Sequence, residues 1–216
     1  MKIPGYALTA LVALGLGLPA RADIMGGNVT SGGGATFIKL TVPLSNPFGA
    51  PNSVGNDTFQ SPNLYGFNES QNTQVLNSPL LLDVGSGPIA VGTIVASHYI
   101  FFDPVDGHIR GTVNFDSKVL GIITSTGNLA ASDYLANTGV NYLNPAARGL
   151  EAGDSVTISG PNQILFDTFA STPGDYVRVL TEFSPASAVP EPSSIILMVT
   201  TLLAVAVVVR KRTALA

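Results

Sequence analysis

The sequence of 216 residues contains no cysteine, no tryptophan and only two histidines, and just 11% of its residues are charged. The absence of cysteine excludes disulfide bonds, thiolate metal ligands and thiol catalysis, so the fold must be held by its core alone. His98 and His108 are the only imidazole bases, and the chain contains neither a G-x-S-x-G turn nor an H-x-x-x-H pair. No catalytic residue is therefore assigned, and we expect a protein that is not an enzyme.

Positive charge is also scarce in the central part of the chain. Between positions 23 and 188, five basic residues stand against thirteen acidic ones, a formal charge of −8. Binding of nucleic acid needs a basic surface, so nucleic acid is not an expected partner. Divalent cations and neutral polymers suit this segment better, although the acidic residues can also simply keep the protein soluble. The other half of the ten basic residues lie near the chain ends: Lys2, Arg21, Arg210, Lys211 and Arg212.

A long apolar run lies near the C-terminus. It extends from Ile195 to Val209 without a charge and, counted from Ser193, is roughly 17 residues long, near the lower limit for crossing a bilayer core of ~30 Å. A transmembrane helix is therefore predicted over 194–209. The basic tail 210–212 follows it, and the positive-inside rule places this tail on the cytoplasmic side. The alternative, a buried terminal helix of a soluble domain, would show an amphipathic pattern that this run lacks.

The N-terminus has the pattern of an export signal. Lys2 is followed by an apolar stretch that ends before Pro19, and then by Ala20 and Ala22 around a single arginine. Small residues at these two positions are what a signal peptidase requires. A signal peptide over 1–22 is therefore predicted, with cleavage after Ala22. Both ends of the chain then indicate the same topology, in which the central segment lies outside the cytoplasm.

The segment before the apolar run contains two prolines around a glutamate. The motif consists of Val189, Pro190, Glu191, Pro192 and Ser193, and the basic stop consists of Arg210, Lys211 and Arg212. Together with the apolar run, they resemble the PEP-CTERM sorting signal (189–212) of exported proteins from Gram-negative bacteria that make extracellular polysaccharide. The resemblance implies that an exosortase, a membrane-embedded enzyme similar to a cysteine transpeptidase, recognises the motif and removes the helix. It also implies residence in the inner membrane before processing, and at the cell surface or in the extracellular matrix afterwards.

Parts of the central segment are similar to ectodomains that other proteins with this tail carry. The similarity covers 101–125, 149–154 and 173–179. It implies a shared fold and assigns no activity.

The central segment, 23–183, is predicted to form one domain that a short linker, 184–188, connects to the sorting signal. Many glycines and prolines, few charges and alternating apolar residues favour an all-β fold, an antiparallel β-sandwich of the jelly-roll type. In the last strand, 176–183, the pattern indicates a core on mostly one side. Strands are expected over 37–42, 89–102, 109–115, 118–123, 154–159, 163–169 and 176–183, a short helix within 126–136, and long loops over 43–79 with short strands near 64–67 and 74–76.

Three aspartates form the one cluster with a pattern that a metal could use. Asp103, Asp106 and Asp116 lie around a predicted hairpin, and calcium prefers oxygen ligands supplied by loops. Their spacing matches no dedicated calcium loop, so ordinary turn chemistry is the favoured explanation, and no cofactor is assigned, with Ca²⁺ as the alternative. His98 is predicted to lie within a strand, and His108 to be a solvated loop residue.

These observations predict an exported protein of the cell envelope or extracellular matrix, with a structural or adhesive role linked to exopolysaccharide. A carbohydrate-binding module, with or without calcium, is the alternative. A glycan hydrolase is a third hypothesis, for which thirteen acidic residues offer too many carboxylate pairs to choose from. The expected partners are signal peptidase and exosortase during processing, the membrane for a limited time, and exopolysaccharide.

Overall fold

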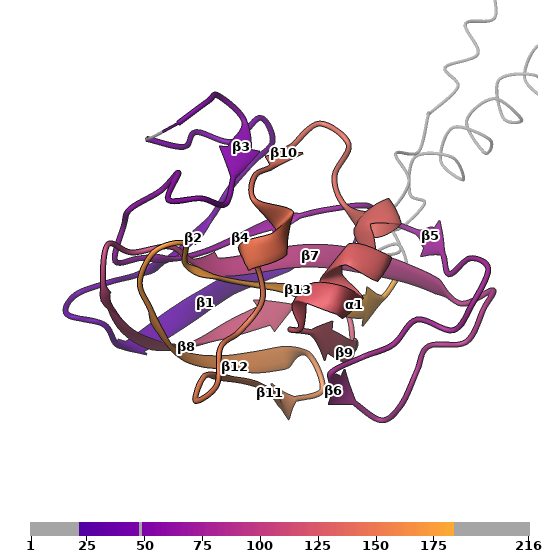
Figure 1. Cartoon of the computed structure of the whole chain (residues 1–216). Coiled ribbons are helices and arrows are strands. Elements are labelled where there is room, and N and C mark those ends of the chain that lie inside the picture. The colour runs from indigo at the N-terminus through magenta and orange to yellow at the C-terminus, as the bar shows by residue number, and fades with distance from the viewer. Residues whose placement is uncertain (1–21, 48, 184–216) are drawn as a thin grey trace, which may run out of the picture. The chain divides into compact units, whose positions relative to one another are not determined.

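Strands dominate the computed structural model of the protein, which describes residues 22–47 and 49–183 (Figure 1). All of these residues belong to one compact unit. The predicted linker, sorting motif, transmembrane helix and basic tail lie outside the described residues, as does the signal peptide apart from Ala22. Among the described residues, no helix combines the length and the apolar character needed to span a membrane.

Most of the described strands belong to two antiparallel sheets. The smaller sheet consists, in spatial order, of β1 (Ile24–Ser31), β8 (Gly107–Phe115), β12 (Gln163–Ala170) and β11 (Ser155–Gly160). The larger sheet consists of β2 (Phe37–Lys39), β4 (Leu64–Asn68), β7 (Ile94–Phe102), β13 (Asp175–Glu182), β9 (Val119–Ile123) and β6 (Val84–Gly85), with β5 (Thr73–Gln74) paired to β7. Only the pairing of β2 with β4 is parallel in these two sheets. A separate small parallel pair joins β3 (Ser53–Val54) and β10 (Asn141–Tyr142).

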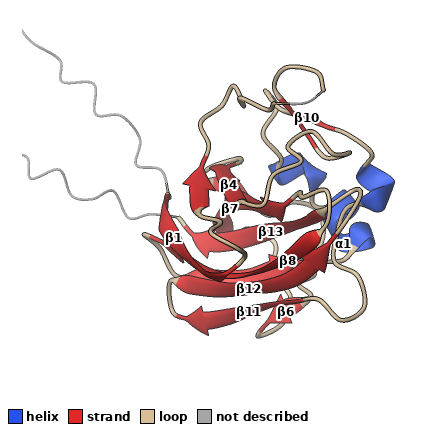
Figure 2. Ribbon diagram, turned by 90° about the vertical axis from the view of Figure 1, so that its left-hand side faces the viewer, coloured by secondary structure: helices blue, strands red, loops and turns tan. Residues whose placement is uncertain are grey.

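The two sheets face each other across a shared apolar core, as in a β-sandwich (Figure 2). In β8 and β12, buried and exposed residues alternate, so every second side chain points into this core. Ile109, Val113 and Phe166 from the smaller sheet pack in one cluster with Val177 and Val179 of β13. The prediction of an antiparallel, mainly β fold is confirmed.

The outer face of the larger sheet is also buried, because helices and loops cover it. The covering layer includes α1 (Thr126–Ala131), η1 (Asp133–Leu135) and η2 (Pro145–Ala147). Leu129 and Leu135 from this layer belong to a second apolar cluster with Tyr99, Tyr176 and Leu180 of the sheet. Strands β7 and β13 are therefore buried on both faces. The predicted one-sided core for the last strand is wrong, because its second face lies under these segments.

The connection between β7 and β8 also differs from the prediction. The two strands do not pair with each other, since β7 lies in the larger sheet and β8 in the smaller one. The loop 103–106 is therefore a crossover between sheets, and the predicted hairpin is wrong.

Candidate functional site

The outer face of the smaller sheet carries an array of accessible polar side chains. Unlike the larger sheet, this face has no described element packed over it, and its outward side chains are exposed or half-buried. Alternation along the strands fixes which residues point outward, because their neighbours in the sequence fill the core. On its three adjacent strands β8, β12 and β11, the outward residues are His108, Arg110, Thr112 and Asn114 of β8, Gln163, Leu165, Asp167 and Phe169 of β12, and Ser155, Thr157 and Ser159 of β11. We call this set the open face.

One end of the open face holds a charged group of three side chains. Asp167 Oδ1 lies 2.8 Å from His108 Nε2, and Arg110 Nη1 donates a hydrogen bond to Asp167 Oδ2. Asp167 is directly opposite Arg110 in the pairing of β12 with β8. The two contacts engage both carboxylate oxygens of Asp167 and leave the other N–H groups of Arg110 as donors.

The other end of the open face holds a neutral group. Gln163 Nε2 donates to Asn114 Oδ1 at 2.8 Å, and Ser159 Oγ donates to Gln163 Oε1 at 2.9 Å. These three residues come from β12, β8 and β11, so the group crosses the sheet. Its hydrogen bonds orient the remaining amide and hydroxyl atoms before any ligand arrives.

An exposed aromatic ring completes the open face. Phe169 of β12 is 57% exposed and lies opposite His108 in the strand pairing. From Gln163 to Phe169, the outward side chains of β12 extend over roughly 20 Å, at about 3.3 Å per residue. Leu165 lies between the neutral and the charged groups, with Thr112 and Thr157 as its neighbours on β8 and β11. The face therefore alternates polar groups with apolar surface along one line.

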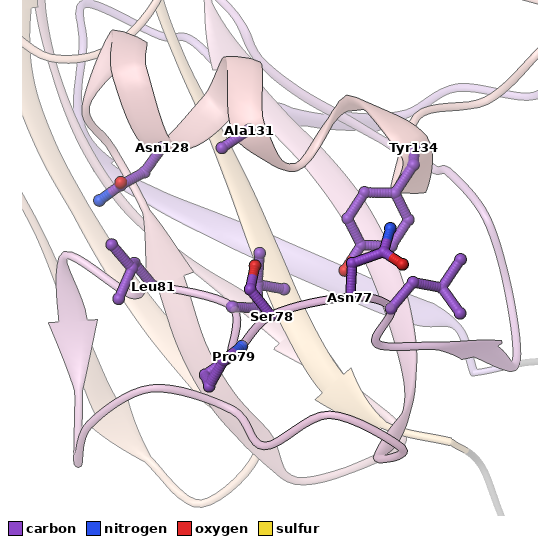
Figure 3. A pocket seen from close by; sticks show the side chains of 9 residues that line it. Asn77, Ser78, Pro79, Leu81, Asn128, Ala131 and Tyr134 are labelled. Atoms are coloured by element: carbon purple, nitrogen blue, oxygen red, sulfur yellow. The ribbon is translucent and has the colours of Figure 1, made fainter.

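A shallow pocket beside α1 is a second accessible feature (Figure 3). It has a volume of about 230 Å³, and its lining includes no charged side chain. Tyr134 and Asn128 approach it from the helical layer, and the loop that precedes β6 closes the other side (Figure 3). The lining residues are Leu76, Asn77, Ser78, Pro79, Leu80, Leu81, Asn128, Ala131 and Tyr134.

Asp83 holds the two walls of this pocket together. Its carboxylate accepts hydrogen bonds from the backbone N–H groups of Thr124 and Ser125, at 2.7 and 2.8 Å, and from Asn128 Nδ2 at 2.7 Å. Partial burial raises the pKa of Asp83, but these hydrogen bonds outweigh it, so the pKa lies below its ordinary value. Asp83 is therefore ionised and caps the start of α1.

A fully buried ion pair lies between the larger sheet and its covering layer. Arg178 and Glu69 are fully buried and form a two-pronged ion pair, with Nε to Oε2 at 2.6 Å and Nη2 to Oε1 at 2.9 Å. Ser97 Oγ donates to Glu69 at 2.6 Å, and Arg178 Nη1 donates to Ser132 Oγ at 2.6 Å. These contacts tie β13 and β7 to the segment after α1. Because the network is enclosed, its role is to hold the covering layer in place rather than to meet a ligand.

The two histidines occupy different environments. His98 is buried in β7, between Asn68 Oδ1 at 2.8 Å and Thr181 Oγ1 at 3.1 Å, so its predicted place in a strand is confirmed. Burial lowers the pKa of His98 to about 3, so its ring is neutral at physiological pH. His108 lies in strand β8 and not in a loop, contrary to the prediction, although it is exposed as expected.

The three aspartates proposed for calcium do not meet. Asp106 and Asp116 flank the two ends of β8, roughly 30 Å apart for a strand of this length, and both are exposed. Asp103 is buried at the end of β7. Within 22–47 and 49–183, no group of three His, Cys, Asp or Glu side chains is placed to hold a metal ion.

Comparisons with known protein families, with curated proteins and with solved structures find no match for this chain. The alternation in 109–115 and 154–159 could have located the outward side chains of the open face. No signal in the sequence separates an open sheet face from a covered one, and none pairs Glu69 with Arg178 across 109 positions.

Proposed function

We propose that this protein is an exported, non-catalytic adhesive protein of the cell envelope that contacts exopolysaccharide through the open face. The observation that supports the proposal is the arrangement of this face. Fixed amide, hydroxyl and guanidinium groups lie on one line with the exposed ring of Phe169. Rigid strands hold these groups, so little ordering is needed when a ligand binds.

The chemistry of the face suits a sugar chain. Sugars present hydroxyl groups that both donate and accept hydrogen bonds, and amide and hydroxyl side chains do the same. The apolar faces of sugar rings need flat hydrophobic partners, which Phe169 and Leu165 offer. A length of roughly 20 Å fits several sugar units of an extended chain, and not a single small molecule.

Charge favours a neutral polysaccharide over an acidic one. The segment 23–188 has a formal charge of −8, and the positive charge of Arg110 on the open face is paired with Asp167. A strongly anionic polymer would therefore meet net repulsion over most of the domain. A neutral polysaccharide meets no such electrostatic repulsion.

The exported location in this proposal rests on the sequence of the two chain ends. The signal peptide, the motif 189–193 and the basic stop 210–212 support processing by signal peptidase and exosortase. We also propose that the β-sandwich is of the jelly-roll type. In the producing bacterium, Glu191→Ala should leave the full-length protein in the inner membrane, detected by its size on an immunoblot of membrane fractions. If this variant is shortened normally, Glu191 is not required for recognition by the exosortase. That result would not affect the proposed binding role of the open face.

Binding of the full chain to exopolysaccharide from the producing bacterium tests the proposed contact. Phe169→Ala should weaken binding about tenfold, because the ring loses its stacking contact. The matched control is Tyr134→Ala, which removes the exposed ring that lines the pocket beside α1. An array of neutral and acidic glycans then identifies the sugar class.

Three outcomes would contradict the proposal. If neither variant changes binding, aromatic stacking on the open face is not involved. If only Tyr134→Ala weakens binding, the pocket beside α1 is the site. Shortening of the polysaccharide by the wild-type protein would instead indicate a glycan hydrolase.

A further inference from the structure

Three polar side chains from separate parts of the chain converge beside the pairing of β2 with β4. Asp23 Oδ1 accepts hydrogen bonds from Lys39 Nζ at 2.5 Å and from Asn68 Nδ2 at 2.6 Å. Because both donors contact one oxygen atom, the two nitrogen atoms lie within about 5 Å of each other, the sum of these two distances. A lysine amine is thus held next to a carboxamide by a carboxylate that contacts both.

The strand pairing explains why Lys39 and Asn68 meet. In the parallel pairing of β2 with β4, Lys39 lies opposite Gly66. Asn68 is two positions further along β4, so alternation places its side chain on the same face of the sheet as that of Lys39. Gly66 carries no side chain that could separate the two, and a long side chain reaches such a diagonal neighbour. Asp23 approaches from the other sheet, at the position directly before β1.

Hydrogen bonds fix the orientation of the Asn68 carboxamide. Partial burial raises the pKa of Asp23, but the hydrogen bonds from Lys39 and Asn68 outweigh it, so the pKa lies below its ordinary value and the carboxylate is ionised. An ionised carboxylate only accepts hydrogen bonds, so Asn68 turns its NH₂ group toward Asp23 and its Oδ1 toward His98 Nδ1, 2.8 Å away. His98 Nδ1 therefore carries the proton, and Nε2 accepts from Thr181 Oγ1 at 3.1 Å. A buried N–H group thus points at the carbonyl oxygen of the carboxamide.

These contacts supply the groups that an exchange of amides requires. Lys39 Nζ becomes a nucleophile when Asp23 accepts its proton. Attack on Asn68 Cγ places negative charge on Oδ1, where the N–H of His98 stabilises it. Asp23 carries both protons that Nζ loses to Asn68 Nδ2, the Cγ–Nδ2 bond breaks, and ammonium leaves. The side chains of Lys39 and Asp23 are partly exposed, so the ammonium has a path to solvent.

We propose that Lys39 and Asn68 form an intramolecular amide cross-link between β2 and β4, with Asp23 as the proton carrier. The bond closes the long segment 40–63 between these strands. A chain without cysteine has no disulfides, and this amide provides a covalent closure of another kind. Because a cross-link restricts the unfolded chain, the bond stabilises the folded protein. This proposal is independent of polysaccharide binding.

The mass of the intact full chain, purified in detergent, tests this bond. The cross-linked protein should be lighter than the mass calculated for its two ends by about 17 Da, because ammonia is lost. Lys39→Arg keeps the positive charge without a nucleophilic amine and should have its full calculated mass. Asp23→Asn removes the proton carrier and should also have its full mass. The matched control is Lys118→Arg, at the only other lysine between positions 23 and 188, which pairs with the exposed Glu182 and should still lose ammonia.

A second pair of measurements reports on the bond and its effect. Fragmentation of a chymotryptic digest of the wild-type protein should identify a branched peptide that joins Lys39 to Asn68. Loss of the link in Lys39→Arg should lower the Tm by roughly 5–10 °C. Lys118→Arg changes only a surface ion pair and should shift the Tm by less than about 2 °C.

Each alternative result contradicts a stated part of the proposal. A wild-type protein with its full calculated mass would overturn the cross-link. A loss of ammonia that persists in Lys39→Arg would overturn it as well, since an asparagine can lose ammonia by closing on its own backbone. Full loss in Asp23→Asn would remove Asp23 from proton transfer. If these variants do not fold, the branched peptide of the wild-type protein decides, and its absence would contradict the bond.

Discussion

The two sheets of this protein differ in what lies on their outer faces. The larger sheet is covered by α1, η1 and long loops, and its central strands β7 and β13 are buried on both sides. The smaller sheet buries one face and leaves the other to solvent. A sheet with both faces buried contributes to stability, whereas an accessible face of fixed polar side chains is available for recognition. We therefore assign a stabilising role to the larger sheet and propose that the smaller sheet provides the binding surface.

The same contrast appears in the ion pairs of the two sheets, and it gives the largest expected effect. Glu69→Ala removes the buried partner of Arg178 and leaves only the partly exposed Asp133, 3.4 Å away, as its counter-charge, so it should lower the free energy of unfolding by about 3–5 kcal/mol. Arg110→Ala breaks the pair with Asp167 on the open face, where both partners are partly exposed, and should cost only about 0–1 kcal/mol. Urea unfolding of both variants measures the difference. Equal losses of unfolding free energy in the two variants would contradict the different roles assigned to the two sheets.

A smaller effect is expected between the sheets, at Asp175. Burial raises the pKa of Asp175 to about 7, and Asp154 and Glu151 add to the shift. The folded state therefore binds the Asp175 proton more tightly than the unfolded state does, and this contribution to stability is lost as pH rises from about 4 to 7. Asp175→Asn, which is always neutral, should raise the free energy of unfolding at pH 8 by about 2 kcal/mol and have little effect at pH 4. Unfolding curves at the two pH values provide the check, and a variant that is less stable at pH 8 would contradict this account.

The sequence predicted the positions of the strands better than which strands pair with one another. Strands β8, β11 and β12 lie close to their predicted positions because alternation is a local signal. Strand β1 was missed, since Gly26 and Gly27 interrupt its pattern, and at Gly27 a Cβ would lie 2.6 Å from Phe37 and 2.5 Å from the backbone of Thr112.

Features that depend on distant segments could not be predicted. The second buried face of β13 depends on helices and loops far away in the chain, so its alternation alone predicts a one-sided core. The crossover at 103–106 has the same turn residues as a hairpin, and only the pairing of β7 with β13 and of β8 with β12 reveals the difference. The open face is open because the covering layer packs on the larger sheet, and the sequence does not show on which sheet that layer lies.

The binding role of the open face is tested most directly by hydrogen exchange of the full chain with and without exopolysaccharide from the producing bacterium. We predict that the polysaccharide slows exchange in β8, β11 and β12, and leaves exchange in α1 and the loop 76–81 unchanged. Slower exchange at α1 and this loop alone, or no change in any strand of the smaller sheet at saturating polysaccharide, would contradict the account.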